Sequence, residues 1–183
     1  ATEAGCDEFL PKPVSSDKTL TLTATGSATN YAKVVTGKTL SAGTMYTLTV
    51  KMGGLLNLSA VTANVTAQDG DVITGTLNTA SYPVKISIAN NATVTLDGIT
   101  INGVNNSSYK WAGLNCQGNA TIILKDGTTN AVSGFYESYP GIHVPNSNTL
   151  TIQGTGTLNA SGSYGAGIGG GYRVNCGNIE IQS

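Results

Sequence analysis

Three stretches of the chain repeat one pattern and decide the fold: NATVTLDGITING at residues 91–103, NATIILKDGTTNAVSG at 119–134 and NTLTIQGTGTLNASG at 148–162. Each begins with an asparagine, at intervals of 28 and 29 residues, and the strand-like NIEIQS begins 30 residues further on, at Asn178. A fixed period of this length is typical of architectures in which one small structural unit stacks on the next. The sequence therefore predicts a stack of coils.

A second set of stretches keeps nearly the same interval: WAGLNC at residues 111–116, YPGIHV at 139–144 and GAGIGG at 165–170. Each contains a glycine followed directly by an aliphatic residue, and these glycines are Gly113, Gly141 and Gly167. One unit of the repeat thus holds two or three short strands separated by Gly, Asn and Asp. A unit of this size cannot bury its apolar residues alone, so it must be covered by its neighbours.

Stacking places like residues in ladders that run through successive coils. From Val84 onward we expect two buried columns, one of Val94, Ile122 and Leu150 and another of Leu114, Ile142 and Ile168. No stretch has a convincing helical period of 3.6, and the strands are too short to alternate with crossover helices. We predict an all-β fold built as a parallel β-helix, with a β-sandwich carrying accidental repeats as the alternative.

The first part of the chain has a different pattern, typical of half-buried antiparallel strands. TLTLTA at residues 19–24 and TMYTLTV at 44–50 alternate between polar and apolar residues, and LLNLSAVTANVT follows at 55–66. The polar QDGD at 68–71 then marks a break. We predict two domains: a small antiparallel, β-sandwich-like part at residues 1–67 and a β-helix at 68–183.

Several of these stretches resemble known proteins. DGDVITGTL at 69–77, ISIANNATVTLDGITING at 86–103 and GAGIGGGYRVNCGNIEI at 165–181 resemble bacterial surface proteins identified as carbohydrate-binding domains with a right-handed parallel β-helix, related to polysaccharide lyases. KTLSAGTMYTLTVKM at 38–52 is similar to the closing strands of fimbrillin-like surface proteins. The resemblance implies a secreted or cell-surface location and an adhesive or glycan-related role.

Composition narrows the range of partners. Charged residues make up 10% of the chain, the net charge is −1 and Arg173 is the one arginine. Nucleic-acid-binding proteins need many basic side chains to neutralise phosphates, so we expect no nucleic acid partner. No run reaches the roughly 18 apolar residues of a membrane helix, so we expect no membrane-spanning segment.

The three cysteines, Cys6, Cys116 and Cys176, show no CxxC spacing, and His143 is the one histidine that could share a metal with them. These features argue against a structural zinc site. Unpaired thiols are our main interpretation, because free cysteine is among the residues most often buried. A disulfide between Cys116 and Cys176 is the alternative.

The positions of the acidic residues indicate whether the chain could act like a β-helical polysaccharide lyase. Such enzymes use a cluster of carboxylates that binds calcium, together with a Lys or Arg that acts as the base. The acids from residue 84 onward are scattered: Asp97, Asp126, Glu137 and Glu180. Asp97 and Asp126 each precede a glycine at nearly equivalent positions one coil apart. We interpret both as turn residues, with calcium bound between the coils as the alternative. We assign no catalytic residue, no metal ligand and no cofactor, and we expect no cleavage of uronate polymers.

Aromatic residues carry the strongest functional signal, because most of them lie shortly before a repeated glycine: Tyr109, Trp111, Phe135, Tyr136, Tyr139, Tyr164 and Tyr172. Trp111 and Tyr139 lie two residues before their glycine and Tyr164 lies three before. In stacked coils such positions are about 4.8 Å apart per coil, the distance between neighbouring strands. We therefore predict a ridge of exposed aromatic rings, with packing of the rings inside the loops as the alternative.

Sugar rings pack their C–H faces on Tyr and Trp, while Asn, Ser and Thr satisfy the hydroxyls. The candidate ligand-binding residues are Trp111, Tyr139, Tyr164, Tyr109, Tyr136 and Arg173. Three functions follow in order of preference: a non-catalytic cell-surface module that binds a polysaccharide or other glycan, a structural adhesin or fimbria-related protein with surface-assembly partners, and a polysaccharide-lyase-like enzyme.

Overall fold

The computed structural model describes residues 20–25, 30–35 and 53–182. The chain forms two compact units, Ala1–Lys51 and Met52–Ser183. In the first unit, β1 (Leu20–Thr25) pairs with β2 (Asn30–Val35) in an antiparallel register. The expected strand at 44–50 and the fimbrillin-like stretch at 38–52 lie outside the described residues.

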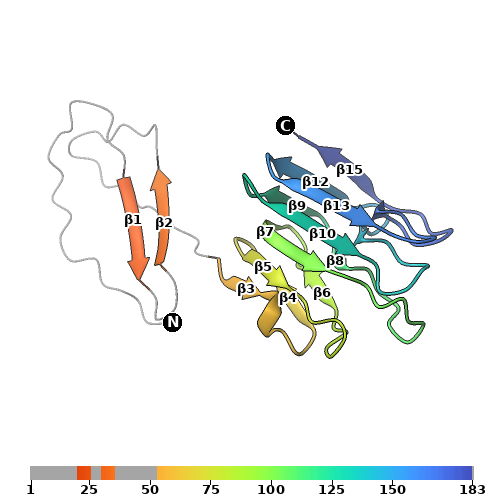
Figure 1. Cartoon of the computed structure of the whole chain (residues 1–183). Helices are drawn as coiled ribbons and strands as arrows, with labels where there is room; N and C mark the ends of the chain where they lie inside the picture. The colour runs from red at the N-terminus through yellow and green to blue at the C-terminus, as the bar shows by residue number, and fades with distance from the viewer. Residues whose placement is uncertain (1–19, 26–29, 36–52, 183) are drawn as a thin grey trace, which may run out of the picture. The chain divides into compact units, whose positions relative to one another are not determined.

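The second unit is a β-solenoid of about four turns whose described strands pair in parallel (Figure 1). Its elements are β3 (Leu55–Asn57), the 3-10 helix η1 (Leu58–Ala60), β4 (Val65–Ala67), β5 (Val72–Thr76), β6 (Ile86–Ile88), β7 (Ala92–Ile101), β8 (Leu114–Cys116), β9 (Ala120–Leu124), β10 (Thr129–Ser133), β11 (Ile142–His143), β12 (Thr149–Gly154), β13 (Thr157–Ser161), β14 (Ile168–Gly169) and β15 (Asn178–Ile181). The prediction of a parallel β-helix is confirmed.

Three faces run along the solenoid. The first face stacks β3, β5, β7, β9, β12 and β15, and the third face stacks β4, β6, β8, β11 and β14. The second face is made by the end of β7 with β10 and β13. Strand β7 contributes to two faces, because its first residues pair with β9 while Thr100 and Ile101 pair with β10.

The predicted register of the column on the third face is confirmed, since Leu114, Ile142 and Ile168 are direct partners in the parallel pairing. Leu114 and Ile142 are fully buried, whereas Ile168, in the last strand of this face, is half-buried. The column on the first face differs by one member. Val94 pairs with Ile122, but Ile122 then pairs with Ile152, while Leu150 pairs with Ala120. The coil between β9 and β12 is two residues longer than the preceding coil. A shift of two keeps Leu150 on the inward side of its strand, so it is still buried, one column away.

The division between the two parts also differs from the predicted one. Strands β3 and β4 pair in parallel with β5 and β6, so residues 53–67 form the first coil of the solenoid. The compact unit accordingly begins at Met52 and not after residue 67. A two-residue alternation is shared by antiparallel strands and by solenoid strands, and it could not distinguish between them.

Asn119, one of the repeated asparagines, and Asn90 stabilise one corner of the solenoid. Asn119 Oδ1 accepts a hydrogen bond from the backbone N–H of Thr149 at 2.8 Å, and Asn90 Oδ1 accepts one from the N–H of Asn119 at 3.0 Å. At this corner the chain turns from the third face to the first. The side-chain amide oxygens accept hydrogen bonds from these backbone N–H groups and so satisfy them. No helix within the described residues is long and apolar enough to cross a membrane.

Candidate ligand-binding site

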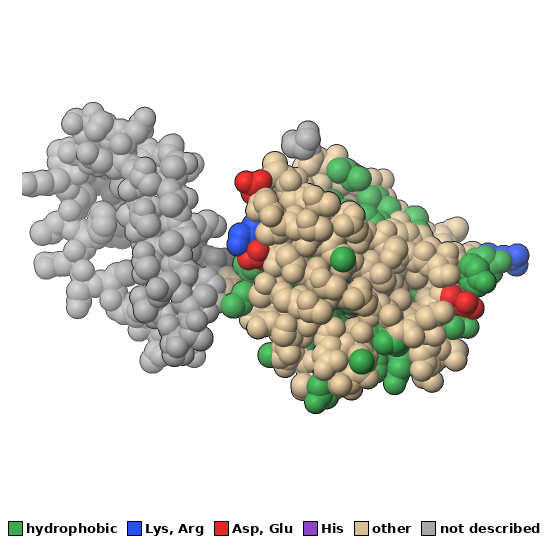
Figure 2. Space-filling model, in the orientation of Figure 1, with side chains coloured by type: hydrophobic (Ala, Val, Ile, Leu, Met, Phe, Trp, Pro, Cys, Tyr) green, Lys and Arg blue, Asp and Glu red, His purple; other side chains and the backbone are tan. Residues whose placement is uncertain are grey.

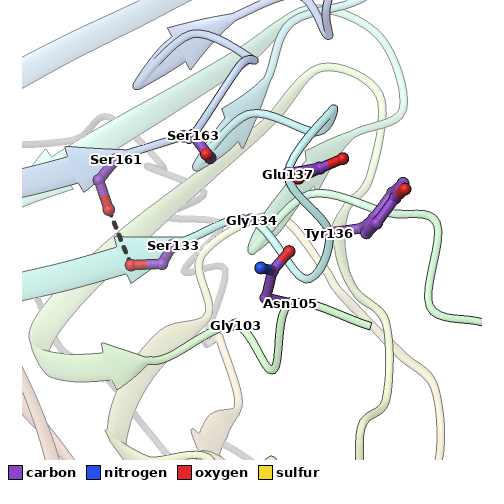
Figure 3. Close-up of a pocket in the computed structure, with 9 residues that line it drawn as sticks. Gly103, Asn105, Ser133, Gly134, Tyr136, Glu137, Ser161 and Ser163 are labelled. Atoms are coloured by element: carbon purple, nitrogen blue, oxygen red, sulfur yellow. Dashed lines mark hydrogen bonds between the residues drawn. The ribbon is translucent and has the colours of Figure 1, made fainter. Parts of the chain in front are cut away.

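An open cleft lies where the second face ends, and it spans three successive coils (Figure 3). Its volume is about 290 Å³. The lining residues are Gly103, Asn105, Ser133, Gly134, Tyr136, Glu137, Ser161, Gly162 and Ser163. Because each coil contributes a short segment at the same corner, the cleft runs from coil to coil. An extended ligand that contacts several coils fits this shape best.

Two serines form the polar floor of the cleft. Ser133 ends β10 and Ser161 ends β13, and the two residues are partners in the parallel register. Their side chains point outward from the second face, and their hydroxyl oxygens lie 2.8 Å apart (Figure 3). The glycine after each serine makes close backbone contact with other segments; a Cβ on Gly134 would collide with the carbonyl oxygen of Tyr139.

The loop that follows Gly134 supplies the ionisable groups of the cleft. Tyr136 and Glu137 project from this loop on the same side (Figure 3). The pKa of Tyr136 is raised, first by the negative charge of Glu137 and then by desolvation. The backbone carbonyl of Glu137 accepts hydrogen bonds from the N–H groups of Tyr164 at 2.7 Å and Gly165 at 3.1 Å, which joins this loop to the next coil.

A pair of exposed tyrosines lies on that next loop. Tyr164 is 63% exposed and Tyr172 is 48% exposed, and their ring centroids are 6.0 Å apart. The guanidinium of Arg173 lies over the Tyr172 ring at 5.0 Å, and the N–H of Tyr172 donates to the carbonyl of Ser138 at 2.8 Å. These contacts hold the pair beside the loop that lines the cleft. One edge of the space-filling view shows hydrophobic side chains between a basic and an acidic group (Figure 2).

The predicted ridge of exposed rings does not form as a single row, because Trp111 packs inward. Its ring lies 5.4 Å from Tyr109 and 5.6 Å from Phe135, and Phe135 is fully buried. The indole Nε1 is covered and finds no acceptor among the described residues. The N–H of Phe135 donates to the carbonyl of Trp111, which fixes the loop against the coil. For Trp111 and Tyr109, packing inside the loops is therefore the correct interpretation.

The other candidates divide by position. Tyr136 lines the cleft, Tyr164 and Arg173 lie beside it, and Tyr139 is half-buried outside the lining. Sequence reasoning missed the two serines that form the floor. The signal was present, because Asn102-Gly103, Ser133-Gly134 and Ser161-Gly162 repeat a polar residue followed by glycine at the end of each second-face strand.

The two Asp-Gly pairs lie at the same corner of the solenoid, Asp126-Gly127 in a turn between β9 and β10 and Asp97-Gly98 inside β7, where that strand passes from the first face to the second. Gly98 and Gly127 have φ values of 68° and 70°, which glycine adopts without strain. Leu96 pairs with Leu124, so Asp97 lies opposite Lys125 and not opposite Asp126. Lys125 Nζ is 2.6 Å from Asp97 Oδ2, the one ion pair among the residues the structure describes. In the same part of the chain, no group of three or more His, Cys, Asp or Glu side chains could hold a metal ion.

The cysteines of the solenoid are both free, with Cys116 buried and Cys176 exposed, so the alternative of a bridge between them is wrong. Cys6 lies outside the described residues. His143 is half-buried on the third face, away from the cleft. Desolvation and, secondarily, the charge of Lys85 lower its pKa.

Comparison with known proteins finds no protein family, no curated protein and no solved structure that matches this chain. The structure confirms the parallel β-helix that the resemblance implies. No matching protein supports the carbohydrate-binding or fimbrillin-like parts of that resemblance.

Proposed function

We propose that this protein is a non-catalytic glycan-binding module, displayed outside the cell, that holds an oligosaccharide along the cleft and against the exposed tyrosine pair. The observation that carries the proposal is the placement of Tyr164 and Tyr172, two exposed rings 6.0 Å apart whose backbone is hydrogen-bonded to the loop that lines a polar cleft. Adjacent exposed apolar side chains beside polar groups are typical of an interaction surface.

The chemistry of the two parts is complementary to a sugar chain. The rings offer apolar faces for sugar C–H groups. The hydroxyls of Ser133, Ser161 and Ser163 and the amide of Asn105 offer donors and acceptors for sugar hydroxyls. A few polar groups set in a concave surface are what give a small-molecule site its orientation and specificity.

Binding is favoured over cleavage because of the number of carboxylates. Glycoside hydrolysis usually requires a pair of carboxyl groups on either side of the scissile bond. Among the nine residues that line the cleft, Glu137 is the one carboxylate. A lyase also needs a basic side chain beside the sugar, and the lining residues include no Lys or Arg.

The test is a glycan array on the purified chain, followed by titration calorimetry with the glycans that bind. Tyr164→Ala and Tyr172→Ala should each weaken binding by about 1 to 3 kcal/mol, the usual range for truncation of an aromatic contact residue. Both should leave the melting temperature nearly unchanged, because the rings are exposed.

Two variants serve as controls. Tyr82→Ala removes another exposed ring, 42% exposed and outside the cleft lining, and should leave affinity unchanged. Trp111→Ala should lower the melting temperature, because that ring packs against Tyr109 and Phe135. If no glycan binds, or if Tyr82→Ala weakens binding as much as Tyr164→Ala does, the proposal fails and a surface-assembly role becomes the better explanation.

A further inference from the structure

We infer that the cleft selects sugars that carry a protonated amino group over uronate-type acidic sugars, and that Glu137 determines this specificity. The inference rests on the proposed function and adds the chemical class of the ligand. It starts from the distribution of charge around the cleft.

Glu137 is the single charged residue among those that line the cleft. Within the described part of the chain, the one ion pair joins Lys125 to Asp97, so no basic side chain there neutralises Glu137. Arg173 is held over the Tyr172 ring and does not line the cleft. The part of a ligand that lies inside the cleft therefore meets one negative charge from the lining, while the positive charge of Arg173 lies at the Tyr172 ring.

The loop that carries the Glu137 carboxylate is also held in place. The Glu137 backbone carbonyl accepts hydrogen bonds from the N–H groups of Tyr164 and Gly165 on the next coil. The carboxylate therefore belongs to a segment that is joined to its neighbour beside the cleft. An ammonium group is the complementary donor, because a charge-assisted N–H bond to a carboxylate is shorter and stronger than a neutral one.

The uncharged part of the cleft fits the rest of such a sugar. Ser133, Ser161 and Asn105 can bond hydroxyls without regard to the charge elsewhere on the ring. A neutral sugar would therefore bind through these groups alone, an amino sugar would add the contact to Glu137, and a uronate would be repelled by it. The cleft is open to solvent, so the added contact is modest, worth about three- to fivefold in affinity.

The experiment compares three oligosaccharides of equal length by titration calorimetry: oligomers of glucosamine, of N-acetylglucosamine and of galacturonate. The wild-type chain should bind the glucosamine oligomer about three- to fivefold more tightly than the N-acetylated one and the galacturonate oligomer most weakly. The preference should shrink as salt rises, because ions screen an exposed charge pair. Glu137→Gln should remove the preference, so that the glucosamine and N-acetylated oligomers bind the variant with nearly equal affinity.

Glu180→Gln is the matched control, because it makes the same change in net charge on β15, outside the cleft lining. It should retain the wild-type preference. Equal affinity for the three oligomers, or a preference that persists in Glu137→Gln, would overturn the charge selection while leaving glycan binding intact. Binding of none of the three would overturn this inference, and the broader glycan array then decides whether the proposed function fails with it.

Discussion

Single residues of the same type have opposite roles in this protein according to what covers them. The rings of Trp111 and Phe135 lie inside the loops and stabilise them, whereas Tyr164 and Tyr172 lie exposed on the next coil. Trp111, Phe135 and Tyr164 each precede a repeated glycine in the sequence by a few residues. The difference arises because the loop that holds Trp111 folds back onto the coil, a contact that a local spacing does not determine.

Cys116 shows how burial changes the chemistry of one group. Desolvation raises the pKa of its thiol from 9.0 to about 12. Above pH 9 the thiol ionises in the unfolded chain and stays protonated in the folded one, so the unfolded state binds fewer protons. The free energy of unfolding therefore falls as pH rises from 9 toward 12, by about 1.4 kcal/mol for each pH unit.

Urea unfolding at pH 8 and pH 10.5 measures this effect. Between these values Cys116→Ala should lose about 2 kcal/mol less stability than the wild-type chain, because it has no buried thiol to ionise. Cys176→Ala should behave like the wild-type chain, since Cys176 is exposed. Parallel pH dependence in all three proteins would show that Cys116 ionises normally and that its surroundings admit water.

The strands are positioned by the corners between them. Gly113, Gly141 and Gly167 come directly before strands of the third face, and the chain at each of them touches the backbone of another segment. A Cβ on Gly141 would lie 2.7 Å from the carbonyl oxygens of Gly167 and Val132. The repeated glycine is thus required by the close approach of successive coils, and its φ angle plays no part.

Gly141→Ala should therefore destabilise the solenoid by about 1 to 3 kcal/mol, as overpacking of a well-packed region does. The matched control is Gly98→Asn, because a Cβ on Gly98 would meet nothing within 4 Å and because its φ of 68° is one that asparagine tolerates. That variant should change stability by about 0.5 kcal/mol or less. Chemical denaturation of both variants checks the comparison; a Gly141→Ala protein as stable as the wild type would mean that the coils have room to separate.

At the scale of the whole molecule, one core is shared by all the coils. Fully buried Ile, Leu and Val residues extend from Leu58 in the first coil to Leu150 near the last. No coil encloses its own core, so each is stabilised mainly by its neighbours. A destabilising substitution in one coil should therefore also destabilise the neighbouring coils.

Ile122→Asp tests this shared core, because Ile122 is fully buried between Val94 and Ile152. A charge at this position has no partner in the ladder, and we expect a loss of about 4 kcal/mol or more, with a single cooperative loss of β-structure by circular dichroism. Ile123→Asp is the control on the same strand. Its side chain is on the outward side and half-buried, so the cost should be about 1 kcal/mol. Equal costs for the two variants would contradict the inward and outward assignment.

The sequence by itself determined the architecture of the second unit. The sequence repeats every 28 to 30 residues. This period predicts the column of Leu114, Ile142 and Ile168 and the glycine before each of them. The reason is physical: strands that stack in parallel must present like residues at like intervals, so the pattern of the fold is a pattern in the sequence.

Tertiary structure alone decided the rest. Loop length moved Leu150 to the neighbouring column, and parallel pairing of β3 and β4 moved the start of the solenoid to Met52. The cleft joins segments from three coils, so no local stretch contains it. Which rings are buried and whether Glu137 has a compensating cation depend on contacts between residues far apart in the chain. Such contacts are set by how the loops fold over the coils, and a repeat period carries no information about them.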